Sequence, residues 1–122
     1  MKIFVVDDNE MQTMLLEDYI TSKTDHEVLV FNTGEECLDN LHEAPHVIIL
    51  DYNLNSVEKD AANGAEILAG IKRHNSATQV IILSSQDPSG ASLASMAEGA
   101  DHYVLKNEAA FANVVTIILG IN

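Results

Sequence analysis

The chain has 122 residues, 47% of them hydrophobic, and its 19 acidic and 6 basic residues give a net charge of −13. This length predicts one domain over residues 1–122, because two ordinary cores need a longer chain. The charge repels nucleic acid phosphates and argues against direct nucleic acid binding. No apolar run approaches the roughly 20 residues of a membrane span and no signal peptide pattern follows Met1, so we expect a cytoplasmic protein without a membrane anchor.

Five short apolar runs predict five strands. The first, third and fourth of them lack the alternation of a half-exposed strand, and a continuous apolar run is typical of a strand covered on both faces of a parallel sheet. The third run ends directly on a carboxylate, Asp51, which makes that residue a candidate for function. The predicted strands are residues 3–6, 28–31, 46–51, 80–83 and 103–105.

A helix is predicted after each strand, because capping residues precede apolar residues at helical spacing. The first covers residues 10–23, and Pro45 stops the second. The fourth, residues 87–98, is rich in small residues, so it is either a weakly anchored, movable helix or a merely frayed one. The predicted caps are Asn9, Thr33 with Glu36, Asn63, Asp87 and Asn107. The predicted core residues of the first helix are Met11, Met14, Leu15, Leu16, Tyr19 and Ile20, and those of the last are Phe111, Val114, Val115 and Ile118.

Five strand-then-helix units with short connections favour parallel strands, right-handed crossovers and helices on both faces of one sheet, which is an α/β three-layer fold. The single cysteine, Cys37, cannot form an internal disulfide, as expected in a reducing compartment. Its place on an amphipathic helix favours a buried apolar residue over a reactive thiol.

Carboxylate, hydroxyl and ammonium side chains follow four of the predicted strands. Parallel strands bring their carboxyl ends to one edge of the sheet, where ligands bind in such folds. Carboxylates this close repel one another, and a hard divalent cation such as Mg²⁺ would offset the repulsion. Each residue alone has a plain explanation as a turn residue, a cap or a solvated lysine, but together they indicate a phosphoryl acceptor. They are Asp7 and Asp8 after the first strand, Asp51 after the third, Ser84 after the fourth and Lys106 after the fifth.

These residues, with Gly99–Lys106, resemble the motifs of the response-regulator receiver domains of two-component signalling, and the resemblance covers essentially the whole chain. It implies a flavodoxin-like (βα)5 fold with sheet order 2-1-3-4-5. It implies that Asp51 is the phosphorylation site, that Ser84 and Lys106 bind the phosphoryl group, and that Tyr103 changes rotamer with the state of Ser84. The implied Mg²⁺ ligands are Asp7, Asp8, Asp51 and the backbone carbonyl of Asn53.

The same resemblance implies a phosphorylation-dependent signalling switch. A histidine kinase or a histidine phosphotransfer protein would donate the phosphoryl group, and a downstream protein target would bind the altered surface of the last two helices and the fifth strand. The domain would catalyse its own phosphorylation and dephosphorylation, with no dedicated turnover of another substrate. A phosphorylation-dependent dimer is compatible with this function. Met11 and Met14, read as core filler from the residues alone, become candidate partner contacts.

The chain departs from the family pattern at three places. Asn107 stands where a proline often follows the lysine, and Ser85 stands where alanine or glycine is common. The connection from Asp51 to Gly64 is longer than usual and lacks its customary proline. It either crowds the site or is a tolerated surface insertion.

Two other functions stay open from the sequence. A receiver fold can serve as an interaction or dimerisation module without phosphorylation, although the complete set of acids and lysine argues against it. A flavodoxin-like flavin binder is the second, and the acidic run of residues 7–10 would repel the flavin phosphate. A zinc site at His42 and His46 is disfavoured, because Pro45 prevents them from sharing a helical face.

Overall fold

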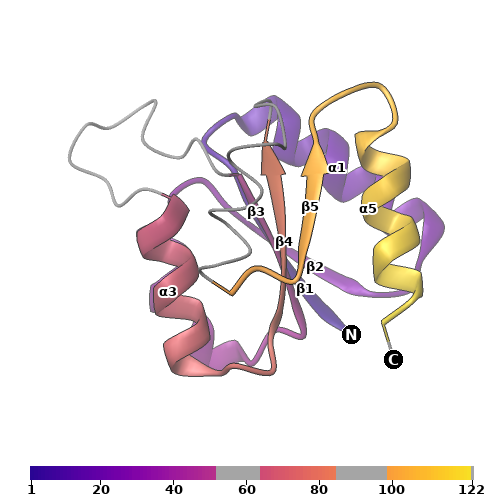
Figure 1. Cartoon of the computed structure of the whole chain (residues 1–122). Coiled ribbons are helices and arrows are strands. Elements are labelled where there is room, and N and C mark those ends of the chain that lie inside the picture. The colour runs from indigo at the N-terminus through magenta and orange to yellow at the C-terminus, as the bar shows by residue number, and fades with distance from the viewer. Residues whose placement is uncertain (52–63, 85–98, 122) are drawn as a thin grey trace.

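The computed structural model describes residues 1–51, 64–84 and 99–121 (Figure 1). Three predicted features lie outside these ranges. They are the helix over residues 87–98 with its cap Asp87, the cap Asn63, and the connection that either crowds the site or is a tolerated surface insertion. The described elements are β1 (Lys2–Val6), α1 (Glu10–Lys23), β2 (Glu27–Phe31), α2 (Gly34–Asp39), the 3₁₀ turn η1 (Leu41–Glu43), β3 (Val47–Asp51), α3 (Gly64–His74), β4 (Gln79–Ser84), β5 (His102–Leu105) and α5 (Ala110–Leu119).

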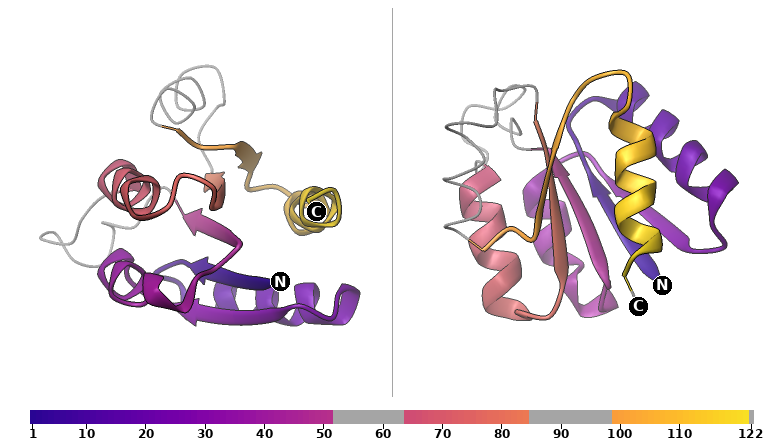
Figure 2. Two further views of the ribbon diagram at one scale, coloured as in Figure 1. Left: turned by 90° about the horizontal axis from the view of Figure 1, so that it is seen from below. Right: turned by 45° about the vertical axis from the view of Figure 1, so that its right-hand side comes forward.

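The five strands form one parallel sheet in the order β2-β1-β3-β4-β5, so the predicted fold class and strand order are confirmed. Helices α1 and α5 cover one face of the sheet, and α2 and α3 cover the other (Figures 1 and 2). Among the described helices, none combines the length and the apolar character that crossing a membrane requires.

The strands at the centre of the sheet have apolar side chains on both faces. In β1, Ile3 and Val5 pack in the cluster with α1 and α5, whereas Phe4 and Val6 pack in the cluster with α2 and α3. Every residue of β3 is buried. This double covering explains why the sequence lacks alternation in these runs, and it confirms the interpretation of them as buried parallel strands.

Two predicted helix caps are present. The side chain of Asn9 accepts a hydrogen bond from the backbone N–H of Gln12 at 3.0 Å, at the start of α1. Thr33 Oγ1 accepts one from the backbone N–H of Glu36 at 3.1 Å, at the start of α2. Both bonds satisfy amide groups that have no partner within the helix. The local sequence therefore places the first turns of α1 and α2 correctly.

The exposed face of α1 differs from the prediction. Leu16 and Ile20 are buried as expected, but Met11, Met14 and Leu15 are 70%, 60% and 51% exposed. Their assignment to the core was wrong, because only a narrow stripe of α1 faces the sheet and α5. The helix is therefore apolar on two faces, one packed against the sheet and one open to solvent.

Two helix ends also differ from the prediction. Helix α2 ends at Asp39 and η1 follows, so the helix stops before Pro45 can end it. Helix α5 begins after Ala109, and Asn107 Oδ1 accepts the backbone N–H of Ala109 at 2.9 Å. Asn107 thus stabilises the turn that precedes α5 and is not the helix cap. A short polar side chain that bonds two residues ahead forms such a turn as readily as a cap.

Candidate functional site

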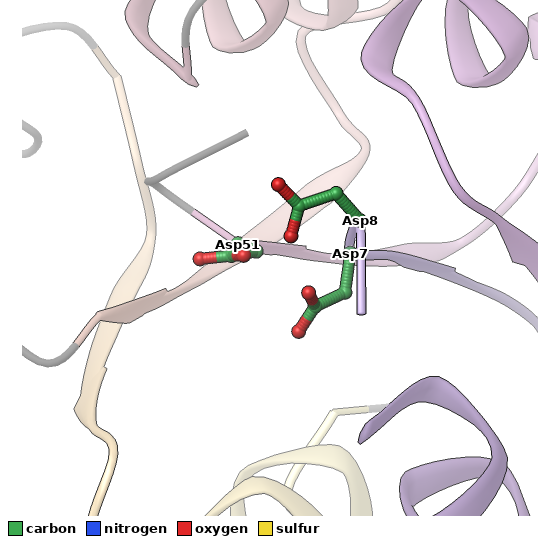
Figure 3. Close-up of side chains that lie close together, drawn as sticks. All are labelled: Asp7, Asp8 and Asp51. Carbon is green, nitrogen blue, oxygen red and sulfur yellow. The ribbon is translucent and has the colours of Figure 1, made fainter. Parts of the chain in front are cut away.

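The carboxyl edge of the sheet carries the predicted site residues. Asp7 and Asp8 directly follow β1, Asp51 is the last residue of β3, Ser84 is the last residue of β4, and Lys106 directly follows β5. In Figure 3 the carboxylates of Asp7, Asp8 and Asp51 turn toward one shared space. The parallel topology produces this convergence, because all strand ends of one polarity lie at the same edge.

The three carboxylates form an acidic pocket, defined here as Asp7, Asp8 and Asp51. One carboxylate oxygen from each lies within 4.8 Å of the others. Asp7 and Asp51 are each only 3% exposed, and Asp8 is partly buried. Three negative charges at these distances repel one another strongly in a partly dehydrated pocket. The pocket therefore needs protons or cations to balance its charge.

Asp7 shows the effect of this crowding. Its Oδ1 atom accepts the backbone N–H of Asn9 at 3.0 Å, whereas its buried Oδ2 atom has no hydrogen-bond partner among the described residues. Burial, and then the neighbouring charge of Asp51, raise the pKa of Asp7 to about 7. The bond from Asn9 was not predicted; the signal for it is an Asp two residues before a helix cap, which is a common turn motif.

The donor set suits a hard divalent cation. Mg²⁺ and similar ions take carboxylate oxygens and keep several waters, so one or two carboxylates and a phosphate oxygen complete their shell. The buried Asp7 Oδ2 atom, which no residue in the described part of the chain hydrogen-bonds, is an oxygen of that kind. Asn53, whose backbone carbonyl was expected to be a further ligand, lies outside the described residues. The carboxylate residues that are described could hold such an ion.

Lys106 supplies the positive charge at this edge. Its Nζ atom donates a hydrogen bond to Asp51 Oδ1 at 3.0 Å and lies 4.0 Å from Asp7 Oδ2. Its side chain remains 25% exposed, so the ammonium lies between the acidic pocket and solvent. Lys106 also donates its backbone N–H to the carbonyl of Ser84 at 2.7 Å. That bond joins the end of β5 to the end of β4.

The positions of Ser84 and Tyr103 follow from their strands, β4 and β5. Ser84 is fully buried at the end of β4. Tyr103 pairs with Ile82 in the β4–β5 register and is partly buried against the core cluster on the α2 and α3 face. The structure thus brings Asp7, Asp8, Asp51 and Lys106 together, with Ser84 at the same edge. The roles assigned to Ser84 and Tyr103 remain predictions, and Ser85 lies beyond the described part of the chain.

Comparison with known proteins gives a family match over nearly the whole chain. The model of the response regulator receiver domain family matches residues 3–118. The alkaline phosphatase synthesis transcriptional regulatory protein PhoP of Bacillus subtilis is 28% identical over 106 residues, which are 86% of this chain and 42% of that protein. The response regulator protein VraR of Staphylococcus saprophyticus is 24% identical over 89% of this chain and 51% of its own length. The chain thus spans about half the length of these curated relatives.

Solved structures show the same fold. The BeF3-activated receiver domain of DrrB, a Thermotoga maritima protein, is 29% identical and superimposes with a TM-score of 0.84. The match covers 98% of this chain and 94% of that domain. The sheet order and the acidic pocket of this chain are consistent with its matches to receiver domains.

Proposed function

This chain belongs to the response regulator receiver domain family, and we propose that it is a phosphorylation-dependent switch whose phosphoryl acceptor is Asp51. In this proposal residues 1–122 form one receiver domain. The phosphoryl donor is a phosphohistidine on a sensor kinase or a phosphotransfer protein, and a downstream protein target responds to the phosphorylated form.

One relationship carries the proposal. Asp51 is the acid that lies both in the acidic pocket and in a 3.0 Å hydrogen bond with the Lys106 ammonium. A phosphoryl group bonded to Asp51 would therefore lie between a metal-binding carboxylate set and a lysine. Stabilisation of the charge on a transferring phosphoryl group requires this placement of positive charge.

Each residue has a role in the transfer. An oxygen of the ionised Asp51 carboxylate forms a bond to phosphorus while the phosphorus–nitrogen bond of phosphohistidine breaks, and the electron pair stays on the ring nitrogen. Lys106 holds a phosphoryl oxygen as a point charge. Asp7 and Asp8 hold Mg²⁺, which supplies charge neutralisation when bound. In the separate hydrolysis step, water attacks phosphorus, the bond between phosphorus and the Asp51 oxygen breaks, and inorganic phosphate leaves while Asp51 returns to a carboxylate.

The output follows from the added charge. A phosphoryl group brings about −1.5 to −2 charges and three acceptor oxygens to the edge of the sheet. In our proposal the Ser84 hydroxyl moves to donate to one of these oxygens, and Tyr103 follows by changing rotamer. The surface that includes β5 and α5 then differs between the two states, and a partner that binds one state better shifts the equilibrium.

The exposed apolar face of α1 is a second part of the proposed function. Met11, Met14 and Leu15 lie on that face, and α1 begins at Glu10, three residues after Asp7. Apolar side chains that are exposed and clustered beside a polar site mark a protein–protein contact more often than a single exposed apolar side chain does. We assign this face to docking of the phosphohistidine-bearing partner, because the donor must bring its ring to Asp51.

Phosphorylation by a small-molecule donor tests the proposal directly. The chain is incubated with acetyl phosphate and Mg²⁺, and its intact mass is measured. We expect a gain of one phosphoryl group in the wild type and in Asp39→Asn, an exposed acid of α2 that serves as the matched control, and none in Asp51→Asn. An unmodified wild type would instead support the interaction or dimerisation module.

A further inference from the structure

A polar clamp fastens the start of β5 to its neighbours. The Asp101 carboxylate accepts the backbone N–H of Val80 at 2.8 Å and the ammonium of Lys72 at 2.7 Å, both through Oδ2. The backbone N–H of Asp101 donates to the carbonyl of Val80 at 3.0 Å. Asp101 is thus bonded to one residue of β4 through both its backbone and its side chain, and to α3 through Lys72.

Lys72 adds a second contact between α3 and the β4 segment. Its ammonium also donates to the carbonyl of Thr78, just before β4, at 2.7 Å. Its stem lies beneath Gly99, where a Cβ atom would be 3.5 Å from Lys72 Cγ. Gly99 has φ 107°, a conformation that glycine adopts readily and that turns the chain into β5. The side chains of Lys72 and Asp101 are only 16% and 28% exposed, so this ion pair is largely withdrawn from solvent.

The apolar pattern of β5 does not specify its register. Val104 packs in the core cluster on the α1 and α5 face, and Tyr103 packs against the cluster on the opposite face. A shift by one residue exchanges the faces of a strand, and in β5 it would still turn an apolar side chain toward each cluster. Among the described strands, β5 also lies at the edge of the sheet and pairs with β4 alone. A polar contact with defined geometry can fix the register that the apolar pattern leaves open.

The register of β5 determines where Lys106 lies. Lys106 directly follows β5, and its backbone N–H continues the ladder to Ser84. A shift by one residue would move Lys106 by about 3.3 Å along the sheet. Such a move would break the 3.0 Å contact between its ammonium and Asp51.

We propose that Asp101, held by Lys72, is a positioning residue that sets the register of β5 and thereby places Lys106 against Asp51. This inference rests on the proposed function, because it assigns to the clamp an effect on phosphoryl transfer. The clamp lies at the amino end of β5 and the site at its carboxyl end, so Asp101 acts through the strand and does not touch the reacting atoms.

The rate of phosphorylation by acetyl phosphate tests the inference. Misplacement of a group by about 1 Å can cost up to about a hundredfold in rate, so we expect Asp101→Ala to lower the rate constant by roughly tenfold. Asp101→Asn keeps an acceptor for Val80 and should recover part of the rate. Lys72→Met keeps the stem beneath Gly99 and removes the ammonium, and it should show a smaller loss. All rates are measured at a temperature where thermal unfolding curves show each variant to be folded.

A double-mutant cycle separates positioning from general destabilisation. If Asp101 acts through Lys106, Asp101→Ala added to Lys106→Met should change the remaining rate by less than about twofold. Mg²⁺ should bind Asp101→Ala at least as tightly as the wild type, because the acidic pocket is built on β1 and β3 and a displaced Lys106 ammonium repels the ion less. Lys2→Met, which removes the 2.8 Å ion pair with Glu43 at the start of β1, is the matched control and should keep the wild-type rate.

Two results would overturn the inference while leaving the proposed function intact. One is an Asp101→Ala variant that is phosphorylated as fast as the wild type. The other is an Asp101→Ala substitution that lowers the rate by the same factor in the Lys106→Met background as in the wild-type background. A wild-type chain that takes up no phosphoryl group would remove the proposed function, and the positioning role with it.

Discussion

The Lys106 ammonium donates a 3.0 Å hydrogen bond to Asp51 across 55 positions of sequence. It lies 4.0 Å from Asp7 as well, so one cation serves two of the three carboxylates of the acidic pocket. The remaining negative charge is what a divalent cation would balance. Lys106 and such a cation would therefore share the pocket, and each would weaken the other's attraction to it.

Removal of the Lys106 ammonium should separate metal binding from phosphoryl uptake. In Lys106→Met we expect Mg²⁺ to bind a few-fold more tightly, because a repelling charge is gone, while the phosphorylation rate falls by about tenfold or more. Isothermal titration and intact-mass kinetics measure the two quantities. Lys23→Met, at the exposed end of α1, is the control and should change neither. Weaker Mg²⁺ binding in Lys106→Met would contradict the proposed charge balance.

Asp7 should make the stability of the metal-free chain depend on pH. Its folded-state pKa of about 7 lies above its ordinary value of 3.8, so the folded state binds this proton more tightly than the unfolded state does. The resulting stabilisation is complete below about pH 4 and is lost as the pH rises through about 7. Urea unfolding should show the free energy of unfolding falling across this window, with on the order of 4 kcal/mol due to Asp7.

Asp7→Asn isolates that contribution, because other acids and the histidines also titrate in the window. We expect the variant to lack the Asp7 part of the slope and to be more stable than the wild type at about pH 8 without metal. Added Mg²⁺ should raise the stability of the wild type more than that of the variant. Identical slopes in the two proteins would show that Asp7 has an ordinary pKa.

The exposed face of α1 should affect partner-dependent transfer alone. Met11→Gln with Met14→Gln alters two side chains that are 70% and 60% exposed, so the free energy of unfolding should change by less than about 0.5 kcal/mol. Transfer from a phosphohistidine protein should slow several-fold, while phosphorylation by acetyl phosphate stays at the wild-type rate. Equal rates with the protein donor would remove this face from the docking surface. By contrast, Leu16→Ala on the buried face should cost about 2 to 5 kcal/mol.

Cys37 should be chemically inert in the folded chain. The thiol is fully buried, and burial raises its pKa to about 12, so almost no thiolate is present at neutral pH. Iodoacetamide should therefore label Cys37 only at the rate at which the chain unfolds. The labelling rate should rise with urea in parallel with loss of helical circular dichroism. Rapid labelling in native buffer would indicate an opening of the α2 face that the fold does not show.

Gly34 should be required for the packing of α2 on α3. A Cβ atom at this position would overlap the side chain of Ile67, which is fully buried and cannot turn away to solvent. We expect Gly34→Ala to lower the free energy of unfolding by about 1 to 3 kcal/mol. Gly120→Ala is the matched control, since its Cβ atom would meet neighbours no closer than 3.4 Å. An equally large loss of unfolding free energy in Gly120→Ala would show that the exchange of glycine for alanine, and not the overlap with Ile67, causes the effect.

Much of the fold could be predicted because the relevant signals are local. A continuous apolar run identifies a doubly covered strand, and Asn9 and Thr33 mark helix starts by their own hydrogen bonds. The convergence of the candidate site residues was predictable for the same reason, since Asp51 and Lys106 each directly end or follow a recognisable strand. A parallel sheet then brings those ends to one edge without further information.

Only the tertiary structure decided which of these residues interact and which apolar residues are buried. The sequence could not show that Met14 is exposed, because exposure depends on how α5 packs beside α1. Nor could it show the raised pKa of Asp7, which depends on burial and on the distance to Asp51. The clamp of Asp101 with Lys72 and Val80 likewise joins three separate elements. Local patterns determine the type of each element, whereas register, burial and charge coupling are set by contacts between residues far apart in the chain.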